Sequence, residues 1–271
     1  MKSILLHVDH DRGFKARLQV ALDIARANNG HITCLQAVSY AVFAPGDIYG
    51  SAMAAAIPVI KENAENLRAE IETELEHEGV SWDWRFVYGM AAQRLLEYSP
   101  LADIVIVGPA ASGESEHGPS ALVGDLVLKS RAPVLVVPAE ATGFDVSAPA
   151  LIAWNGSSEA CHAVRGAVPL LACSCKVTLA SIAEEQDKPR FDLPSTEGAR
   201  YLSRHGIACE LVEIPRGEAK IADTLVSAAQ VRDCGLMVMG AFGHTRLTEL
   251  LFGGVTRQML TEPPLPILLA H

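Results

Sequence analysis

Positive charge is scarce in this chain of 271 residues. Lysine and arginine number 22 against 32 acidic residues, which gives a formal net charge of −10 and a sequence pI of about 5.4. The basic side chains form no cluster longer than a pair. Because the phosphates of nucleic acids repel an acidic surface without a basic patch, we expect no nucleic-acid partner.

Long hydrophobic runs are also missing. The longest weakly polar stretch, residues 40–60, is interrupted by two prolines, an aspartate and a glycine, whereas a membrane-spanning helix needs ~18 apolar residues in a row. The apolar stretch within residues 1–9 is too short for a secretory signal peptide. Six cysteines without such a signal are typical of reduced, small apolar residues rather than of a disulfide framework. We therefore expect no membrane association and a cytoplasmic protein.

An internal repeat is the most informative feature of the sequence. The strand-like run Ile4–Asp9, followed by a helical pattern, returns as Ala150–Asn155 followed by a second helical pattern. The ends of the two halves also match. Asp103–Gly108 corresponds to Gly235–Gly240, and Pro133–Val137 corresponds to Pro266–Ala270. A repeat of this length predicts two similar structural units in one chain.

Each half alternates short, continuous apolar runs with longer amphipathic ones, which is typical of a buried parallel sheet with helical crossovers. The predicted fold class is therefore α/β, with two tandem doubly wound five-stranded parallel-sheet domains at residues 1–140 and 149–271. The aperiodic residues 138–149 join them. The strands are expected at residues 3–8, 31–38, 82–88, 103–107 and 133–137, and at 150–154, 176–182, 208–214, 235–240 and 266–270. The helices are expected at residues 14–28, 58–78, 91–99 and 120–130, and at 157–172, 195–205, 218–232 and 255–261.

A glycine-rich loop follows the fourth strand of the second half. It contains Gly240, Gly243, Gly253 and Gly254, and the last two stand where the final helix should begin. Glycines let backbone amides approach a phosphate, and the unpaired N–H groups of a helix start attract an anion. With strand order 3-2-1-4-5, the ligand crevice lies between the first and fourth strands. The first strand of this half ends at residues 154–157, across that crevice.

This combination resembles the universal stress protein family, whose ATP-binding members carry Gly-x2-Gly-x9-Gly-(Ser/Thr) after the fourth strand. Gly240, Gly243 and Gly253 fit this spacing. The resemblance covers both halves and implies a fold like that of the adenine nucleotide alpha hydrolases, and a regulatory module that binds ATP, ADP or AMP, with Mg²⁺ as an accompanying ion. It implies that the adenosine meets the ends of the first and second strands, at Trp154, Asn155, Gly156, Ser181 and Ile182. The phosphates would meet the loop and the following helix, at Gly240, Gly243, His244, Gly253, Gly254, Val255 and Thr256.

Two positions depart from the family pattern. Gly254 stands where the family has Ser or Thr, although Thr256 offers a hydroxyl nearby, and Asn155 replaces a frequent Asp. An amide can still bond to adenine or ribose. The alternative interpretation is that these glycines only form a tight turn and a helix entry, in which case the chain is a structural or interaction protein without nucleotide.

The matching loop of the first half is degenerate. Pro109 removes an amide, the second spaced glycine is missing, and Glu114 and Glu116 add negative charge where phosphates would sit. We expect this half not to bind ATP in the family manner. Asp9, at the end of its first strand, is either a turn and helix cap before the first helix or a vestige of a ligand site.

Signatures of enzymatic relatives are absent. The sequence contains no Gly-x4-Gly-Lys-(Ser/Thr), no Ser-Gly-Gly-x-Asp-Ser and no His-x-Gly-His. Beyond Glu249 and Asn155, it offers no general base and no pair of metal-binding carboxylates near the loop. We expect no catalytic residue, and slow ATP hydrolysis at most. Cys173 and Cys175 lack the two-residue spacer of zinc or redox motifs, so we expect core packing there and no metal site.

The two apolar fifth strands, at Pro133–Val137 and Pro266–Leu269, would be exposed edges unless covered. Single-domain members of the family dimerise through this strand, so the resemblance implies that the two strands pair within the chain and make an intramolecular pseudo-dimer. A homodimer of the whole chain and an unidentified protein partner remain open alternatives.

Overall fold

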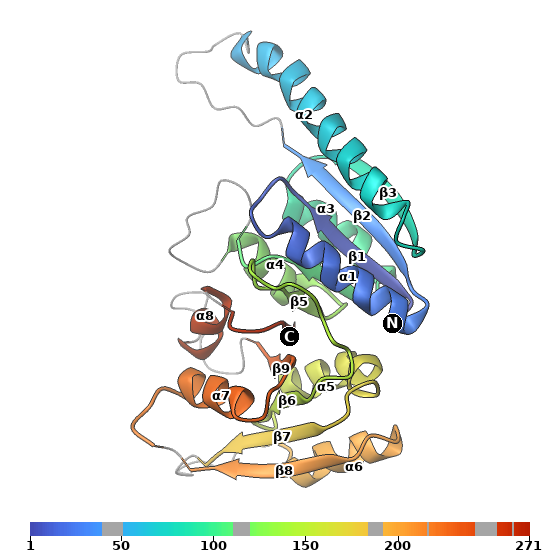
Figure 1. Ribbon diagram of the computed structural model, residues 1–271. Helices are drawn as coiled ribbons and strands as arrows, with labels where there is room; N and C mark the ends of the chain where they lie inside the picture. Colours follow the sequence, from blue (N-terminus) through green and yellow to red (C-terminus); the bar gives the residue numbers. More distant parts are fainter. Residues whose placement is uncertain (40–50, 111–119, 184–191, 216, 242–253, 262) are drawn as a thin grey trace.

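One continuous sheet of ten strands runs through the molecule (Figure 1). The computed structural model describes residues 1–39, 51–110, 120–183, 192–215, 217–241, 254–261 and 263–271. The strand order is β3-β2-β1-β4-β5-β10-β9-β6-β7-β8, which is the order 3-2-1-4-5 followed by its mirror. The predicted α/β class and the strand order in both halves are confirmed.

The first half contains β1 (Ser3–Val8), α1 (Phe14–Asn28), β2 (His31–Val38), α2 (Ser51–Leu75), β3 (Ser81–Tyr88), α3 (Ala91–Tyr98), the 3-10 turn η1 (Ser99–Leu101), β4 (Ile104–Val107), α4 (Ala121–Lys129) and β5 (Val134–Val136). The second half contains β6 (Ala150–Ala153), α5 (Ser158–Leu171), β7 (Val177–Ile182), α6 (Ser195–Arg204), β8 (Cys209–Ile214), α7 (Ile221–Gln230), β9 (Leu236–Gly240), α8 (Gly254–Thr261) and β10 (Ile267–Ala270). Within each half, neighbouring strands are parallel.

The two halves meet through their fifth strands. β5 and β10 pair antiparallel, with Leu135 opposite Leu268 and both side chains fully buried. The predicted pairing of the fifth strands within the chain is confirmed. Because this pairing covers both apolar edges, neither strand is left as a template for another chain.

Two hydrophobic layers cover the faces of the sheet across both halves. One layer collects the buried faces of α1, α2, α5 and α6, and the other collects those of α3, α4, α7 and α8. β4, buried at every residue, lies between these layers, as continuous apolar strands of a parallel sheet should. None of the helices in the described ranges has the length and hydropathy that crossing a bilayer requires.

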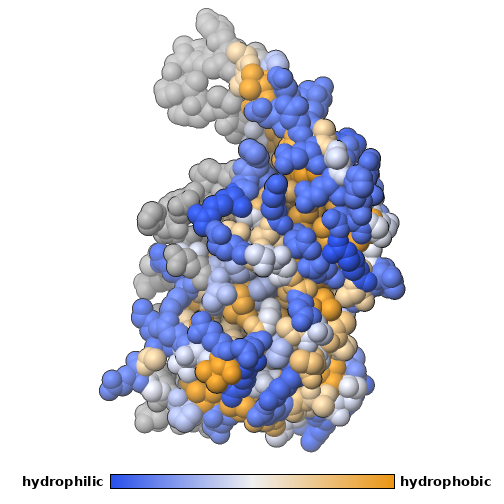
Figure 2. Space-filling model, viewed as in Figure 1, coloured by the Kyte–Doolittle hydropathy of each residue, from blue (hydrophilic) through white to orange (hydrophobic). Residues whose placement is uncertain are grey.

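The main departure from the predicted elements is α2. The helix was expected at residues 58–78, but it runs from Ser51 to Leu75 with Pro58 inside it. Proline removes only one helical hydrogen bond, and the alanine-rich stretch before it favours helix, so the helix begins earlier. Its first turns project beyond the sheet (Figure 1), and Ile57 and Val59 are exposed there. Hydrophobic residues are visible at this upper end of the molecule (Figure 2).

Candidate functional site

The crevice predicted for the second half falls where β6, β7 and β9 end. In the strand register, Ala153 is the partner of both Ala180 and Met239. The next residue of each strand therefore falls at the same edge, which brings together Trp154, Ser181 and Gly240. Ile182 ends β7 beside them, half-buried like Ser181. These predicted site residues thus lie together at the carboxyl edge of the sheet, where open α/β sheets bind ligands.

Trp154 contributes its backbone rather than its ring to this edge. Its side chain is 6% exposed, and its indole N–H donates to the backbone oxygen of Leu193 over 3.0 Å. A Cβ added at Gly198, in α6, would lie 3.2 Å from the ring. The ring is therefore part of the packing beneath α6.

Gly156 forms a turn that only glycine fits. Its φ is +79°, and a Cβ there would lie 2.3 Å from the backbone oxygen of Leu193. Leu193 also donates its amide to the oxygen of Gly156 over 2.9 Å. The chain before α6 therefore crosses directly over the turn between β6 and α5, a contact that the sequence analysis missed.

Asn155 is the exposed polar side chain of this turn. Its Oδ1 accepts a hydrogen bond from the amide of Ser157 over 3.2 Å. Ser157 in turn caps α5, since its Oγ accepts from the amide of Ala160 over 3.2 Å. The amide nitrogen of Asn155 has no partner in the part of the chain that the structure describes, so its two N–H groups can donate to a ligand.

Gly240 brings the end of β9 against the start of α5. A Cβ at this position would lie 2.4 Å from the amide nitrogen of Ala160 and 2.9 Å from the Cβ of Glu159. The glycine is therefore required for close packing, whatever its part in binding. Glu159 is 7% exposed and lies in the first turn of α5, where the helix dipole favours a carboxylate. Burial, followed by the negative charge of Glu159, raises the pKa of the neighbouring Cys161 thiol.

The remaining predicted residues belong to the loop and to α8. Gly243, His244 and Gly253 lie outside the described residues. Gly254 is the first residue of α8, followed by the half-buried Val255 and by Thr256, which is 6% exposed. Burial keeps most of the Thr256 side chain from solvent.

At the corresponding place in the first half, Arg17 lies between the ends of β1 and β4. This side chain is 0% exposed, donates from Nε to the backbone oxygen of His7 over 2.9 Å, and forms a bidentate ion pair with Asp11. A Cβ at Gly108, the counterpart of Gly240, would lie 3.0 Å from Nη1 of Arg17. The guanidinium therefore occupies the place that corresponds to the crevice predicted for the second half.

The helix-cap interpretation of Asp9 and the core packing expected for two cysteines both fail in the structure. Asp9 does not cap α1, because the N-cap residue is Gly13, and Asp9 instead accepts from the amide of His10. Cys173 and Cys175 do not pack in the core. Cys175 is exposed and Cys173 is half-buried, because both lie in the turn that leads from α5 to β7. The described residues contain no group of three side chains suited to a metal ion.

Two charged residues that were not predicted as part of the site, Arg17 and Glu159, could have been recognised from the sequence. Arg17 interrupts the apolar face of α1, between Phe14 and Ala21, so its charge falls where a hydrophobic residue belongs. Glu159 follows Ser157 at the start of a helix, a pattern typical of a capped first turn. Both signals mark charged groups at the carboxyl edge of the sheet.

Comparisons with known proteins show which family and which solved structures this chain is similar to. The family model described as "Universal stress protein family" matches residues 149–271. These residues belong to the universal stress protein family. The fold extends over both halves: a universal stress protein from Archaeoglobus fulgidus DSM 4304 superimposes with a TM-score of 0.73 at 15% identity, covering 98% of this chain and 97% of that one.

Two other solved structures complete the comparison. A functionally unknown protein from Pseudomonas aeruginosa PAO1 has a TM-score of 0.60 at 19% identity, covering 100% of this chain and 92% of its own. A universal stress protein in complex with cAMP matches 47% of this chain and 99% of its own, with 18% identity and a TM-score of 0.36. No curated protein sequence matches the chain.

Proposed function

We propose that this universal stress protein binds one adenine nucleotide, ATP, ADP or AMP, in its second half and acts as a nucleotide-dependent regulatory module. The observation that carries the proposal is the position of Gly240. It ends β9 against the start of α5, and the spaced glycines Gly243 and Gly253 follow it in sequence. A phosphate cradle needs this order of strand end, glycine loop and helix start.

The adenosine would occupy the edge formed by Trp154, Asn155, Ser181 and Ile182. Backbone groups at the ends of β6 and β7, together with the exposed amide of Asn155, supply donors and acceptors for adenine and ribose. The phosphates would contact Gly240, Gly243, His244, Gly253 and the start of α8 at Gly254, Val255 and Thr256. A Mg²⁺ ion would enter with the phosphates and neutralise part of their charge.

A carboxylate introduced at Gly243 tests the site. Like charges ~4 Å apart at an effective dielectric constant near 20 repel by about 4 kcal/mol, which lowers affinity roughly a thousandfold. We expect Gly243→Asp to lose ATP binding in calorimetry while its circular dichroism spectrum stays unchanged. The matched control is Gly113→Asp in the corresponding loop of the first half, which should bind ATP like the parent.

Gly254→Ser tests the opposite direction. The added hydroxyl restores the family residue at a helix start and should improve ATP affinity by about 1 kcal/mol, roughly fivefold, through a cap or a phosphate contact.

If Gly243→Asp binds ATP as the parent does, the loop holds no phosphate, and the glycines serve the turn alone.

A further inference from the structure

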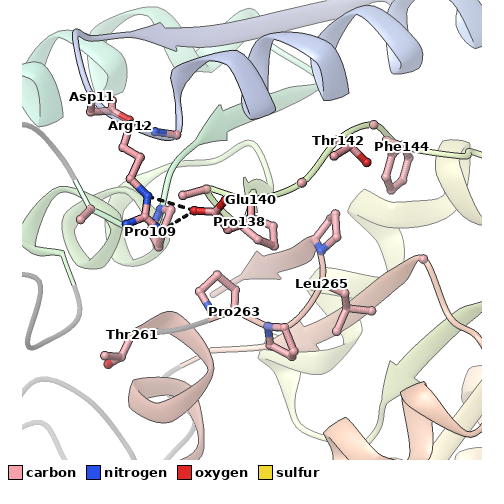
Figure 3. A pocket seen from close by; sticks show the side chains of 18 of the residues that line it. Asp11, Arg12, Pro109, Pro138, Glu140, Thr142, Phe144, Thr261, Pro263 and Leu265 are labelled. Atoms are coloured by element: carbon pink, nitrogen blue, oxygen red, sulfur yellow. Dashed lines mark hydrogen bonds and ion pairs between the residues drawn. The ribbon is translucent and has the colours of Figure 1, made fainter.

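A pocket of about 1060 Å³ lies along the seam between the two halves (Figure 3). It is lined by residues that follow β1, β4 and β5 of the first half and by residues that precede β6, β9 and β10 of the second half. Because β5 and β10 are antiparallel, the carboxyl edge of the first half meets the amino edge of the second half at this seam. We call this hollow the seam pocket. Its volume is at the upper end of the range for small-molecule sites.

The walls of the seam pocket are unsuited to a phosphate. Five of the lining residues are prolines, at positions 109, 138, 263, 264 and 266, and proline has no backbone N–H to offer an anion. Pro109, Pro138 and Pro263 surround the hollow in the close-up view (Figure 3). Their rigid, saturated rings instead present apolar faces against which a planar ring can pack, and these faces lose little conformational freedom when a ligand binds.

The charge of the lining also disfavours an anion. Among the described lining residues, the carboxylates are Asp11, Glu140 and Asp145, the guanidinium is Arg12, and the imidazole is His10. Asp11 is already neutralised by its bidentate contact with the buried Arg17. Glu140 and Asp145 therefore outnumber Arg12, and the pocket keeps an excess of negative charge in a chain whose net charge is −10.

The ion pair between Arg12 and Glu140 lies along the first-half side of the seam pocket and does not close it. The two side chains are 76% and 75% exposed, and such exposed pairs contribute little to stability. Figure 3 shows both side chains extending into the hollow, with Thr142 at its side. A ligand can therefore displace this contact at small cost and use the released carboxylate of Glu140.

We propose that the seam pocket binds a small molecule with a flat ring system and a neutral or positive charge. The site is distinct from the nucleotide crevice of the second half. It occupies the corresponding edge of the first half, where Pro109 removes an amide from the loop that matches the glycine loop of the second half.

Three naphthalene probes that differ in charge test this proposal: 2-naphthylmethylamine, 2-naphthalenemethanol and 2-naphthoate. Their affinities for the full chain are measured at pH 8 by calorimetry and by naphthalene fluorescence. We expect the amine to bind at least as tightly as the alcohol, and the carboxylate at least tenfold more weakly. Equal affinities for the three probes, or tightest binding of 2-naphthoate, would overturn the charge assignment.

Two variants locate the probes. Thr142→Trp places a bulky ring at an exposed lining position and should weaken all three probes at least tenfold, whereas Thr73→Trp, on the exposed side of α2, should leave them unchanged. Glu140→Lys should weaken the amine and strengthen the carboxylate, whereas Glu197→Lys, which breaks an exposed pair with Arg200, should change neither.

Unchanged binding to both Thr142→Trp and Glu140→Lys would place the probes elsewhere and refute the proposal. Circular dichroism confirms that each variant is folded. Saturating ATP should not displace the amine. Displacement would place the ring in the nucleotide crevice and would also contradict the proposal, whereas loss of ATP binding alone affects only the proposed nucleotide function.

Discussion

The two halves differ in what lies against the glycine at the end of their fourth strand. In the second half, Gly240 contacts the backbone at the start of α5, and a Cβ would lie 2.4 Å from the Ala160 amide nitrogen. In the first half, Gly108 contacts the end of the Arg17 side chain, and a Cβ would lie 3.0 Å from Nη1. Backbone atoms of α5 therefore lie beside the strand end in the second half, whereas the buried guanidinium of Arg17 lies there in the first half. The same fold therefore holds different groups at the end of its fourth strand in the two halves.

The largest expected effect comes from removing the cation. Arg17→Ala leaves the Asp11 carboxylate, whose side chain is 14% exposed, without its partner, and should lower the free energy of unfolding by about 3–5 kcal/mol in urea titrations. Arg17→Met with Asp11→Asn should recover much of the loss, because apolar replacement of a buried pair is often neutral.

Arg200→Ala is the matched control for Arg17→Ala. It breaks an exposed pair with Glu197 on α6 and should cost less than about 0.5 kcal/mol. Equal effects of Arg17→Ala and Arg200→Ala would show that the buried guanidinium is not what stabilises this edge of the first half.

An alanine at each of the two corresponding glycines gives the next largest effect. Gly240→Ala forces a methyl group into backbone atoms of α5 that cannot move independently, and should cost about 2–3 kcal/mol. Gly108→Ala meets a side-chain terminus and should cost about 1 kcal/mol. Thermal and urea unfolding of both variants measures the difference. A larger loss of stability in Gly108→Ala than in Gly240→Ala would contradict this comparison of the two halves.

The architecture could be predicted from the sequence, but the difference between the two halves at the end of the fourth strand could not. Continuous apolar strands such as Ile104–Val107 and the repeat between the halves predicted a parallel sheet in each half. The strand order and the pairing of β5 with β10 followed from the resemblance to the universal stress protein family. Arg17 was not predicted as a crevice residue, because its contacts with Asp11 and His7 depend on how the loop before α1 folds. Likewise, nothing near Gly156 in the sequence indicated that Leu193, 37 positions later, lies against it.

The smallest expected effect concerns Asp103, whose counterpart in the second half is Gly235. The carboxylate of Asp103 accepts from the amides of Lys2 and Ser3 over 2.5 and 3.0 Å. Burial would raise the pKa of Asp103, but these two hydrogen bonds outweigh it and hold the pKa below the ordinary value of 3.8. Asp103→Asn should cost about 0.5–1 kcal/mol at pH 7, since partial exposure weakens both bonds.

The pH dependence of this variant checks the assignment. A carboxylate with a lowered folded-state pKa stabilises the fold above the unfolded value of 3.8, and its contribution disappears as the pH falls through the folded-state pKa. The gap between parent and Asp103→Asn should therefore narrow below pH 3.8 in urea titrations. A gap that stays constant down to the lowest pH would contradict the assigned hydrogen bonds.

The number of nucleotides bound per chain distinguishes one binding half from two. Native mass spectrometry of the full chain, titrated with ATP, should show one bound nucleotide at saturation in the parent and none in Gly243→Asp. The first half should add no second nucleotide, because Arg17 lies between the ends of β1 and β4. Two nucleotides per parent chain, or one that persists in Gly243→Asp, would contradict the account.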